Sequence, residues 1–387
     1  MKKRSTSNNS HTSARLSAVL LAILLLLPAC TRQPRPARIE EITFQSGAFT
    51  LVGDLRLPEG TGPFPVVLFV HGDAPADRTM YGMYLPIMER MLRAGYAVFS
   101  WDNPGIGQST GTTDQWQIIH QQAQIVLEAI DVMKGHSDIE ADRMGLWGIS
   151  MAGYVMPRVL SLTEDIAFMI CVSCPGMSGV DQGAYLTAAE GLCAGVPEEK
   201  ADRLKGLLAE LERARTYSTY AEYRQYRAVL AALTEIGSLA RDSGREVVPE
   251  QSWQANDPSN QRWWNPIEVI EQVRIPVLAI FGERDTQTDP VQGAYAWRKA
   301  LAQAENPNFR VEVLPGADHM PGVSSTGCTA EAQQTAEKML QEQGYNSLDE
   351  ALALFQEEPG QHQPGSAYPY APGYLDLIEE WLRGLPQ

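Results

Sequence analysis

Short, continuous apolar runs recur along this chain of 387 residues, and stretches with helical periodicity separate them. Clear cases are 65–70 (PVVLFV) and 275–281 (IPVLAIF). A run that is apolar at every position is typical of a strand covered on both faces, as in parallel sheets. Strands that alternate with helices indicate a parallel sheet wrapped by helices on both sides. The sequence therefore predicts an α/β fold with a mostly parallel central sheet.

The same patterns predict the order of elements, and the chain shows no internal repeat. Two strand-like segments flank Ser46-Gly47, which is a hairpin signal. The expected strands cover residues 39–45, 49–57, 65–70, 96–101, 143–147, 166–172, 275–281 and 309–314. The expected helices cover residues 84–94, 114–133, 151–162, 291–302 and 374–385.

Strand signals disappear between about residues 177 and 264, where helical stretches rich in Ala, Glu, Arg and Tyr follow one another. Because this block falls between two expected strands of one sheet, we interpret it as a cap or lid rather than an independent domain. The predicted division is a signal peptide (1–29), a tether (30–38), a first part of the core (39–176), a helical cap (177–265) and a second part of the core (266–387) with a polar insertion at about 321–367.

The N-terminus has the pattern of a secretory signal. Four basic residues and no acidic residue lie in Met1–Arg15, and the apolar run Leu16–Leu27 follows. The run is too short for a comfortable membrane span. The segment 27–30 (LPAC) resembles a bacterial lipobox, which predicts acylation of Cys30 and a lipoprotein anchored in the bacterial envelope, periplasmic or at the surface. A plain signal peptide cut nearby is the alternative.

Charge excludes one class of partner. Removal of residues 1–29 changes the formal net charge from −16 to −20. A chain this acidic has no basic stripe for phosphate backbones, so we expect no nucleic-acid partner. The expected partners are a small acyl substrate and, through the lipid, a membrane; the oligomeric state is left open.

Besides Cys30, four cysteines remain after cleavage, and an exported protein can pair them. Cys193 and Cys328 lie in the two insertions, so a disulfide between them is one possibility. Cys171 and Cys174 have a spacing seen in metal sites, but no second Cys or His cluster completes a zinc site. We therefore expect no metal.

One serine stands in an unusual setting. Residues 143–153 (RMGLWGISMAG) run from an expected strand into an expected helix, with small residues around Ser150. Any α/β protein needs such tight turns, and a nucleophile elbow is the more specific interpretation. A serine nucleophile needs a base, and the base needs an orienting group.

Both partners follow later strands. Asp285 lies in FGERDTQTDP after one strand, and His319 lies in LPGADHM after the next. The order Ser, Asp, His places three polar side chains at the carboxyl edge of one sheet. Asp289 is an alternative acid, and each residue alone has a structural alternative. Three other histidines follow no expected strand: His120, His136 and His362.

These motifs together resemble the α/β-hydrolase family, in particular its serine esterase and acyl-peptidase-like branch with a helical cap. The resemblance runs from about residue 40 to the C-terminus, without the insertion 321–367. The supporting motifs are HGDAPADR (71–78), DNPGIGQSTG (102–111), GISMAG (148–153), WWNP (263–266), FGERD (281–285) and LPGADHM (314–320).

The resemblance also assigns the oxyanion hole, to the backbone N–H groups of Asp73 and Met151. Two positions depart from the family pattern. Ala152 stands where the family has Gly, and Asp73 brings an acidic side chain close to developing negative charge, unless it points away or pairs with a cation such as Arg78. His71 is expected to shape the loop rather than transfer protons.

The predicted activity is carboxylic ester hydrolysis through an acyl-enzyme, with Ser150 as nucleophile, His319 as base and Asp285 as its orienting acid. This mechanism needs no metal or organic cofactor. The alternatives are a peptidase or amidase, an acyltransferase, and a non-catalytic binding lipoprotein. Aromatic residues of the cap either pack the cap or form an apolar acyl pocket: Tyr217, Tyr220, Tyr223, Tyr226, Trp253, Trp263 and Trp264.

Overall fold

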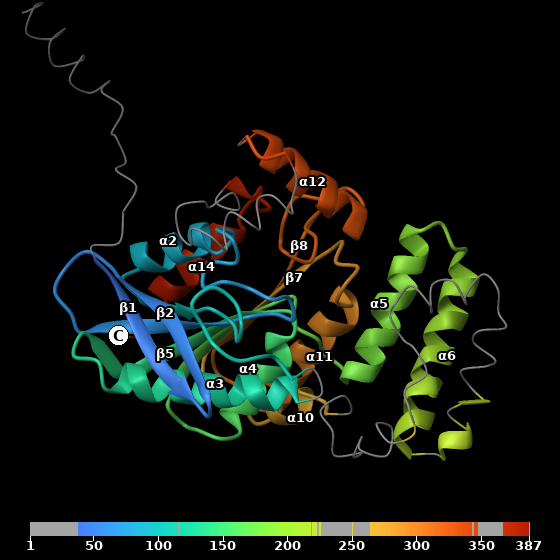
Figure 1. The fold of residues 1–387 in the computed structure, drawn as a ribbon, viewed down its shortest axis with the longest axis horizontal. Coiled ribbons are helices and arrows are strands. Elements are labelled where there is room, and N and C mark those ends of the chain that lie inside the picture. Colours follow the sequence, from blue (N-terminus) through green and yellow to red (C-terminus); the bar gives the residue numbers. More distant parts are fainter. Residues whose placement is uncertain are drawn as a thin grey trace, which may run out of the picture. The chain divides into compact units, whose positions relative to one another are not determined.

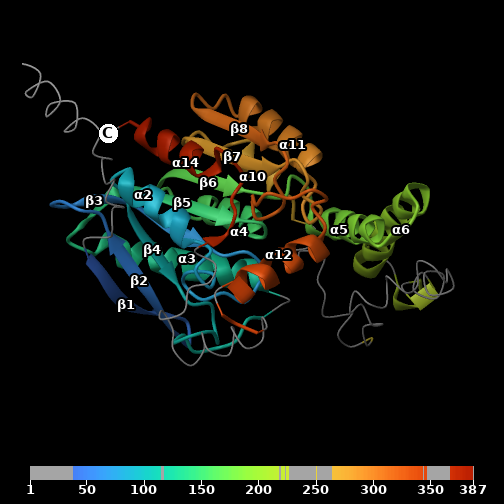
Figure 2. The same ribbon diagram turned by 90° about the horizontal axis from the view of Figure 1, so that it is seen from above.

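Eight strands form one sheet in the order β1-β2-β4-β3-β5-β6-β7-β8 (Figures 1 and 2). Their bounds are β1 (Arg38–Ser46), β2 (Phe49–Leu57), β3 (Phe64–Val70), β4 (Ala97–Trp101), β5 (Ile139–Ile149), β6 (Ile166–Val172), β7 (Val277–Gly282) and β8 (Phe309–Leu314). Strands β1, β2 and β4 pair antiparallel, and every pairing from β4 through β3 to β8 is parallel. The predicted mostly parallel sheet is confirmed.

The computed structural model describes residues 38–114, 117–217, 219–222, 224–225, 250, 264–342, 344–346 and 367–386. The predicted signal peptide, Cys30 and all but the last residue of the tether lie outside these ranges, so those predictions stay predictions. Within the described ranges no helix is long and apolar enough to cross a membrane.

Helices cover both faces of the sheet. Successive residues of β3 point to opposite sides: Val66 and Leu68 join one buried cluster, and Val67 and Phe69 join the other. On the first side lie α3 (Ile118–Lys134), α4 (Ala152–Leu160) and α11 (Pro290–Gln303), and on the second lie α2 (Leu85–Arg93) and α14 (Tyr374–Arg383) (Figures 1 and 2). This two-sided burial explains the strands that are apolar at every position.

Element boundaries differ from the predicted ones by a few residues, and one difference has a clear physical reason. Strand β7 begins at Val277, whereas the apolar run begins at Ile275. Pro276 has no N–H to give to a ladder, so it precedes the strand rather than joining it. Its carbonyl still accepts a hydrogen bond from Met169 N at 2.9 Å.

In the described residues, helices follow β6 before the chain returns to the sheet at β7. Helices α5 (Gly179–Cys193) and α6 (Glu198–Tyr217) lie side by side (Figures 1 and 2). Ser178 caps α5, its hydroxyl accepting the N–H of Asp181 at 3.3 Å. Four of the aromatic residues considered for an acyl pocket lie outside the described ranges: Tyr223, Tyr226, Trp253 and Trp263. The description of this segment as a cap stays an interpretation.

Two further helices are short or peripheral. Helix α10 (Ile267–Ile270) precedes β7, and its Ile270 is fully buried in the first cluster. Helix α12 (Thr329–Glu342) lies in the predicted polar insertion, and its Leu340 is buried. Within its described residues the insertion therefore contains one helix.

Candidate active site

Ser150 follows β5 directly, and Met151 is the N-cap of α4. The φ angle of Ser150 is 59°. A side-chain-bearing residue in this left-handed region is uncommon and marks a strained turn. A strained serine between a parallel strand and a helix has the geometry of a nucleophile elbow.

The small residues around Ser150 have a steric reason. A Cβ atom added to Gly148 would lie 2.5 Å from the Cβ of Ala152, and one added to Gly153 would lie 2.6 Å from the Cβ of Cys174. Ala152 is fully buried and occupies the space that a side chain at Gly148 would need. Ala152, which departs from the family pattern, thus fits because residue 148 is a glycine.

Asp285 and His319 meet at the ends of adjacent strands, β7 and β8. His319 Nδ1 lies 2.9 Å from Asp285 Oδ2 and 3.1 Å from Oδ1. Asp285 Oδ1 also accepts the N–H groups of Gln287 and Thr288, each at 2.8 Å. A carboxylate only accepts, so Nδ1 carries the proton and Nε2 is the ring nitrogen left for a reacting group.

Burial and charge act in opposite directions on His319. Burial disfavours the imidazolium, but the charge and hydrogen bond of Asp285, with a smaller contribution from Asp318, raise the pKa of His319 above its ordinary value of 6.5. Burial also raises the pKa of Asp318, although its Oδ1 accepts the N–H groups of Met320 and Gly322. These two hydrogen bonds from the backbone to Asp318 stabilise the turn that carries His319.

The alternative candidates have other partners. Asp289 caps α11, its Oδ1 accepting the N–H groups of Val291 and Gln292 at 3.1 and 3.0 Å. His136 Nε2 lies 3.1 Å from a carboxylate oxygen of Glu40. His120 is exposed on α3, and His362 lies outside the described residues.

The loop after β3 lies against the elbow. A Cβ atom on Gly72 would be 3.4 Å from the Cβ of Ser150. His71 is buried, burial lowers its pKa, and its Nε2 donates to the carbonyl of Trp101 at 2.6 Å. A neutral, hydrogen-bonded His71 thus fixes the start of this loop, as the sequence predicted.

The two predicted oxyanion donors, Asp73 and Met151, directly follow Gly72 and Ser150, which lie against each other. Met151 is the N-cap of α4, at the helix end where the first N–H groups have no partner within the helix. Asp73 is exposed and follows Gly72, which lies against Ser150. Their assignment as the oxyanion hole stays a prediction.

Arg78 has two other carboxylate partners, so its suggested pairing with Asp73 stays a prediction. Arg78 donates to Asp102 through Nε at 3.1 Å and Nη2 at 2.8 Å, and to Asp54 through Nη1 at 2.6 Å. Asp102 also accepts the backbone N–H of Arg78 at 2.8 Å. The carboxylate of Asp102 is almost fully buried, and a buried carboxylate needs a cation more than an exposed one does.

Cys171 and Cys174 form a disulfide at the end of β6, directly behind the elbow. Both residues are fully buried. The sequence showed this CxxC spacing, but nothing in it selected a disulfide over two separate thiols. Among the described residues, no group of three or more His, Cys, Asp or Glu side chains could hold a metal ion.

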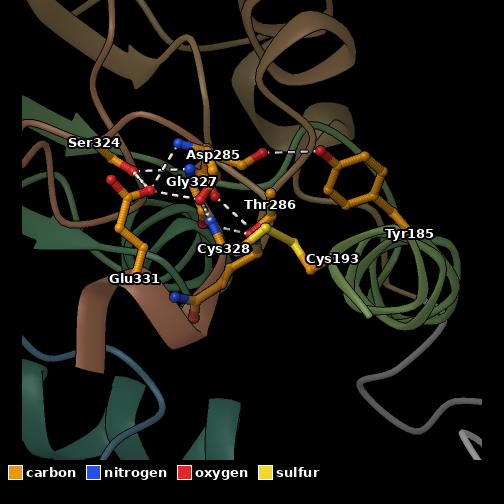
Figure 3. Close-up of a disulfide and its surroundings, with 10 residues drawn as sticks. Tyr185, Cys193, Asp285, Thr286, Ser324, Gly327, Cys328 and Glu331 are labelled. Carbon is orange, nitrogen blue, oxygen red and sulfur yellow. Dashed lines mark hydrogen bonds between the residues drawn. A yellow bond between two sulfur atoms is a disulfide. The ribbon is translucent and has the colours of Figure 1, made fainter. Parts of the chain in front are cut away.

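Helix α5 contacts the turn that carries Asp285, which the sequence did not indicate. Tyr185 OH donates to the carbonyl of Asp285 at 2.9 Å (Figure 3), and Gln182 Nε2 donates to the carbonyl of Gln287 at 2.5 Å. A second disulfide joins Cys193 to Cys328 beside this contact (Figure 3), the pairing that the sequence had left open.

A cavity of about 370 Å³ opens beside this disulfide. Ser150 and His319 are not among the residues that line it: Tyr185, Ala188, Ala189, Leu192, Cys193, Ala201, Asp202, Lys205, Thr286, Thr326 and Cys328. The cavity is therefore next to the Asp285 turn rather than at the reacting serine.

The structure brings Asp285 and His319 into contact and places Ser150 at the same sheet edge, since all three follow the carboxyl ends of parallel strands. No hydrogen bond joins Ser150 to His319 within the described part of the chain. Such contacts are often long in ligand-free enzymes and shorten with substrate.

A model of the alpha/beta hydrolase family matches residues 67–328. The chain is 32% identical over 127 residues to 20-hydroxy-prefusarin hydrolase of Gibberella moniliformis, which covers 31% of this chain and 27% of that protein. It is 22% identical over 304 residues to esterase EstD of Thermotoga maritima, covering 75% of this chain and 63% of that one. The chain thus spans less than two thirds of the length of these curated relatives.

Solved structures with a similar fold include a Pyrococcus furiosus esterase, at 16% identity and a TM-score of 0.47, covering 73% of this chain and 83% of that one. A proline iminopeptidase of Mycobacterium smegmatis has 18% identity and a TM-score of 0.43, covering 73% of this chain and 92% of that one. The family match and the strand order together confirm the predicted α/β-hydrolase fold.

Proposed function

The chain belongs to the alpha/beta hydrolase family. We propose that it is a serine hydrolase that cleaves carboxylic esters. The observation that carries the proposal is the buried pair of Asp285 and His319, which lies at the same sheet edge as the strained Ser150. Packing alone does not require a serine, an acid and a histidine after three parallel strands.

The reaction proceeds through an acyl-enzyme. His319 Nε2 takes the proton of Ser150 as the hydroxyl oxygen attacks the acyl carbonyl, and the imidazolium then gives that proton to the leaving alcohol. Water attacks the acyl-enzyme with His319 again as base. Asp285 holds the ring in the tautomer that exposes Nε2 and stabilises the imidazolium, in line with the raised pKa of His319.

The tetrahedral oxyanion would accept hydrogen bonds from the N–H groups of Met151 and Asp73. A donor placed where charge develops lowers a barrier by about 3–4 kcal/mol. The position of Gly72 against Ser150 supports this assignment, because it brings the loop with Asp73 to the elbow. The exposed carboxylate of Asp73 has access to water, which weakens its repulsion of the oxyanion.

Ester rather than amide hydrolysis is the preferred activity. The name of the Thermotoga maritima relative, an esterase, supports it. The test is a series of p-nitrophenyl esters of increasing acyl length beside the matching p-nitroanilides. We expect ester turnover that is lost in Ser150→Ala, and a kcat/KM for anilides at least a hundredfold lower. Faster anilide turnover would make the protein an amidase, and acyl transfer to an added alcohol in preference to water would make it an acyltransferase.

We also propose that the chain is exported and acylated at Cys30. Two disulfides in the described residues support export, because disulfides persist in oxidising compartments. Metabolic labelling with a radioactive fatty acid is expected to mark the full-length protein in membranes, and Cys30→Ser is expected to remove the label. A wild-type protein that is processed but never labelled would instead indicate a plain signal peptide.

A further inference from the structure

The turn that carries Asp285 is held on one side by helix α5. The hydroxyl of Tyr185 and the side-chain amide of Gln182 donate to the carbonyls of Asp285 and Gln287. Figure 3 shows the ring of Tyr185 reaching from the helix to this turn. Helix α5 therefore contacts the backbone of the very residue whose carboxylate orients His319.

The same turn is held on its other side by the loop 324–328. Arg284 Nη1 donates to the carbonyl of Ser324, and Thr286 Oγ1 donates to the carbonyl of Gly327, each at 2.7 Å. Gly327 has a φ of +76°, and a Cβ atom there would lie 1.6 Å from the carbonyl oxygen of Arg284. Only a glycine permits this close approach.

The loop itself is rigidly built. The carboxylate of Glu331 accepts a hydrogen bond from Ser324 Oγ at 2.7 Å (Figure 3). It also accepts the backbone N–H groups of Ser325 and Thr326, each at 2.7 Å. Hydrogen bonds from Ser325 and Thr326 hold the pKa of Glu331 well below its ordinary value. A loop fixed in this way transmits a constraint at Cys328 to its contacts with Arg284 and Thr286.

The disulfide between Cys193 and Cys328 joins these two supports. Cys193 is the last residue of α5, and Cys328 ends the loop, 135 residues later in the sequence. Helix α5, the Asp285 turn, the loop and the disulfide thus form a closed ring of contacts (Figure 3). Cys193 is exposed, whereas the disulfide of Cys171 with Cys174 is fully buried.

We propose that the disulfide of Cys193 with Cys328 is a positioning cross-link for Asp285, which clamps the turn after β7 between α5 and the loop 324–328 and makes catalysis depend on the redox state of the protein. This inference rests on the proposed hydrolase function. The cysteines act through the turn and touch neither substrate nor reacting atoms.

Opening the cross-link is a balanced exchange. A dithiol gives two electrons and two protons to the S–S bond, which becomes the two thiols of Cys193 and Cys328, while the dithiol becomes a cyclic disulfide. Access decides which bond reacts, so a mild dithiol opens the disulfide of the exposed Cys193 and leaves the fully buried disulfide of Cys171 with Cys174 closed. Alkylation followed by mass spectrometry is expected to find two modified cysteines, Cys193 and Cys328.

The test is a double-mutant cycle between the cross-link and the hydrogen bond from α5. The variants are Cys193→Ser/Cys328→Ser, Tyr185→Phe and their combination, with Tyr295→Phe on the exposed face of α11 as a matched control. We expect about a tenfold loss of kcat from the cysteine variant, because small misplacements of catalytic groups have large effects on rate. The combined variant should lose less than the product of the two separate losses, and the control should match wild type.

A second readout separates positioning from general stability. Asp285 and Asp318 are the acidic groups that face His319, and only the first lies on the clamped turn. A loosened Asp285 supports the imidazolium less, so the pKa of His319, followed by NMR titration with His319→Asn for assignment, should fall in the cysteine variant. This titration needs no turnover.

The outcomes are distinct. A folded cysteine variant with wild-type kcat and an unchanged His319 titration would overturn the cross-link proposal while leaving the hydrolase proposal intact. A folded wild type without any ester turnover would instead reject the proposed ester hydrolysis. The His319 titration would still show whether the cross-link positions Asp285. If the cysteine variant does not fold, wild type reduced by the mild dithiol takes its place, and reoxidation should restore kcat.

Discussion

His319 Nδ1 lies 2.9 Å from Asp285 Oδ2, and the two residues are 6% and 2% exposed although they are 34 positions apart in the sequence. A buried ion pair is costly unless its hydrogen bonds are complete. Here Asp285 accepts two further N–H groups, so its oxygens are well satisfied. The arrangement places a hydrogen-bonded carboxyl group beside a histidine in a buried site, which is what orientation and stabilisation of an imidazolium require.

Removing the charge of Asp285 should abolish most activity. Asp285→Asn keeps the size of the side chain but favours the wrong tautomer of His319, so kcat should fall by about 10⁴-fold. Asp289→Asn is the matched control, because asparagine also caps helices well and kcat should stay within about twofold. Steady-state kinetics on a p-nitrophenyl ester checks both. The reverse pattern would identify Asp289 as the acid.

The pH dependence should report the raised pKa of His319. The base must be neutral, so kcat/KM should fall as the pH drops through a pKa above 6.5. In Asp285→Asn the acid limb of the residual activity should move to lower pH, because burial then opposes the charged form with less compensation. The raised pKa of His319 also adds to the free energy of unfolding. This contribution is complete below about pH 6.5 and is lost as the pH rises through the raised pKa of the folded protein. A pH profile without an acid limb between pH 5 and 9 would contradict this account.

The cluster around Arg78 should matter for stability. Arg78→Met leaves the buried carboxylate of Asp102 without its cation, and the free energy of unfolding should fall by about 3–5 kcal/mol. Arg310→Met removes an exposed pair with Glu312 and should cost less than about 1 kcal/mol. Urea unfolding followed by tryptophan fluorescence measures both. Equal losses would mean that the burial of the cluster has no energetic consequence.

Crowding at the elbow is testable with a pair of glycines. Gly153→Ala would bring a methyl group to 2.6 Å from the Cβ of Cys174, so it should destabilise by about 1–3 kcal/mol and lower kcat. Gly206→Ala, on an exposed face of α6 with no atom within 4 Å, should stabilise by about 0.5–1 kcal/mol. Thermal unfolding and ester kinetics distinguish the two. A neutral Gly153→Ala would show that the elbow can shift away from β6.

Much of the sheet was predictable from the sequence because burial on both faces leaves a local pattern, as in Pro65–Val70. The pairing of Asp285 with His319 was predictable because each follows the carboxyl end of a strand, and parallel strands bring these ends to one edge. Both arguments need only neighbouring residues and the order of elements.

Other contacts depend on distances that no local pattern encodes. The partners of Arg78 come from β2 and from the end of β4, and the sequence offered only the nearby Asp73. Tyr185 reaches the Asp285 turn from a helix whose orientation the sequence does not determine. The pairing of Cys171 with Cys174 could not be chosen over free thiols, because spacing alone does not select a disulfide.

The central claim is tested most directly by covalent labelling of the soluble form, from Thr31 onward, with a fluorophosphonate. The account predicts one labelled residue, Ser150, in wild type, and no label in Ser150→Ala or His319→Ala. Asp289→Asn should label at the wild-type rate. A well-folded wild type that remains unlabelled, or that is labelled at another serine, would contradict the assignment of Ser150 as the nucleophile.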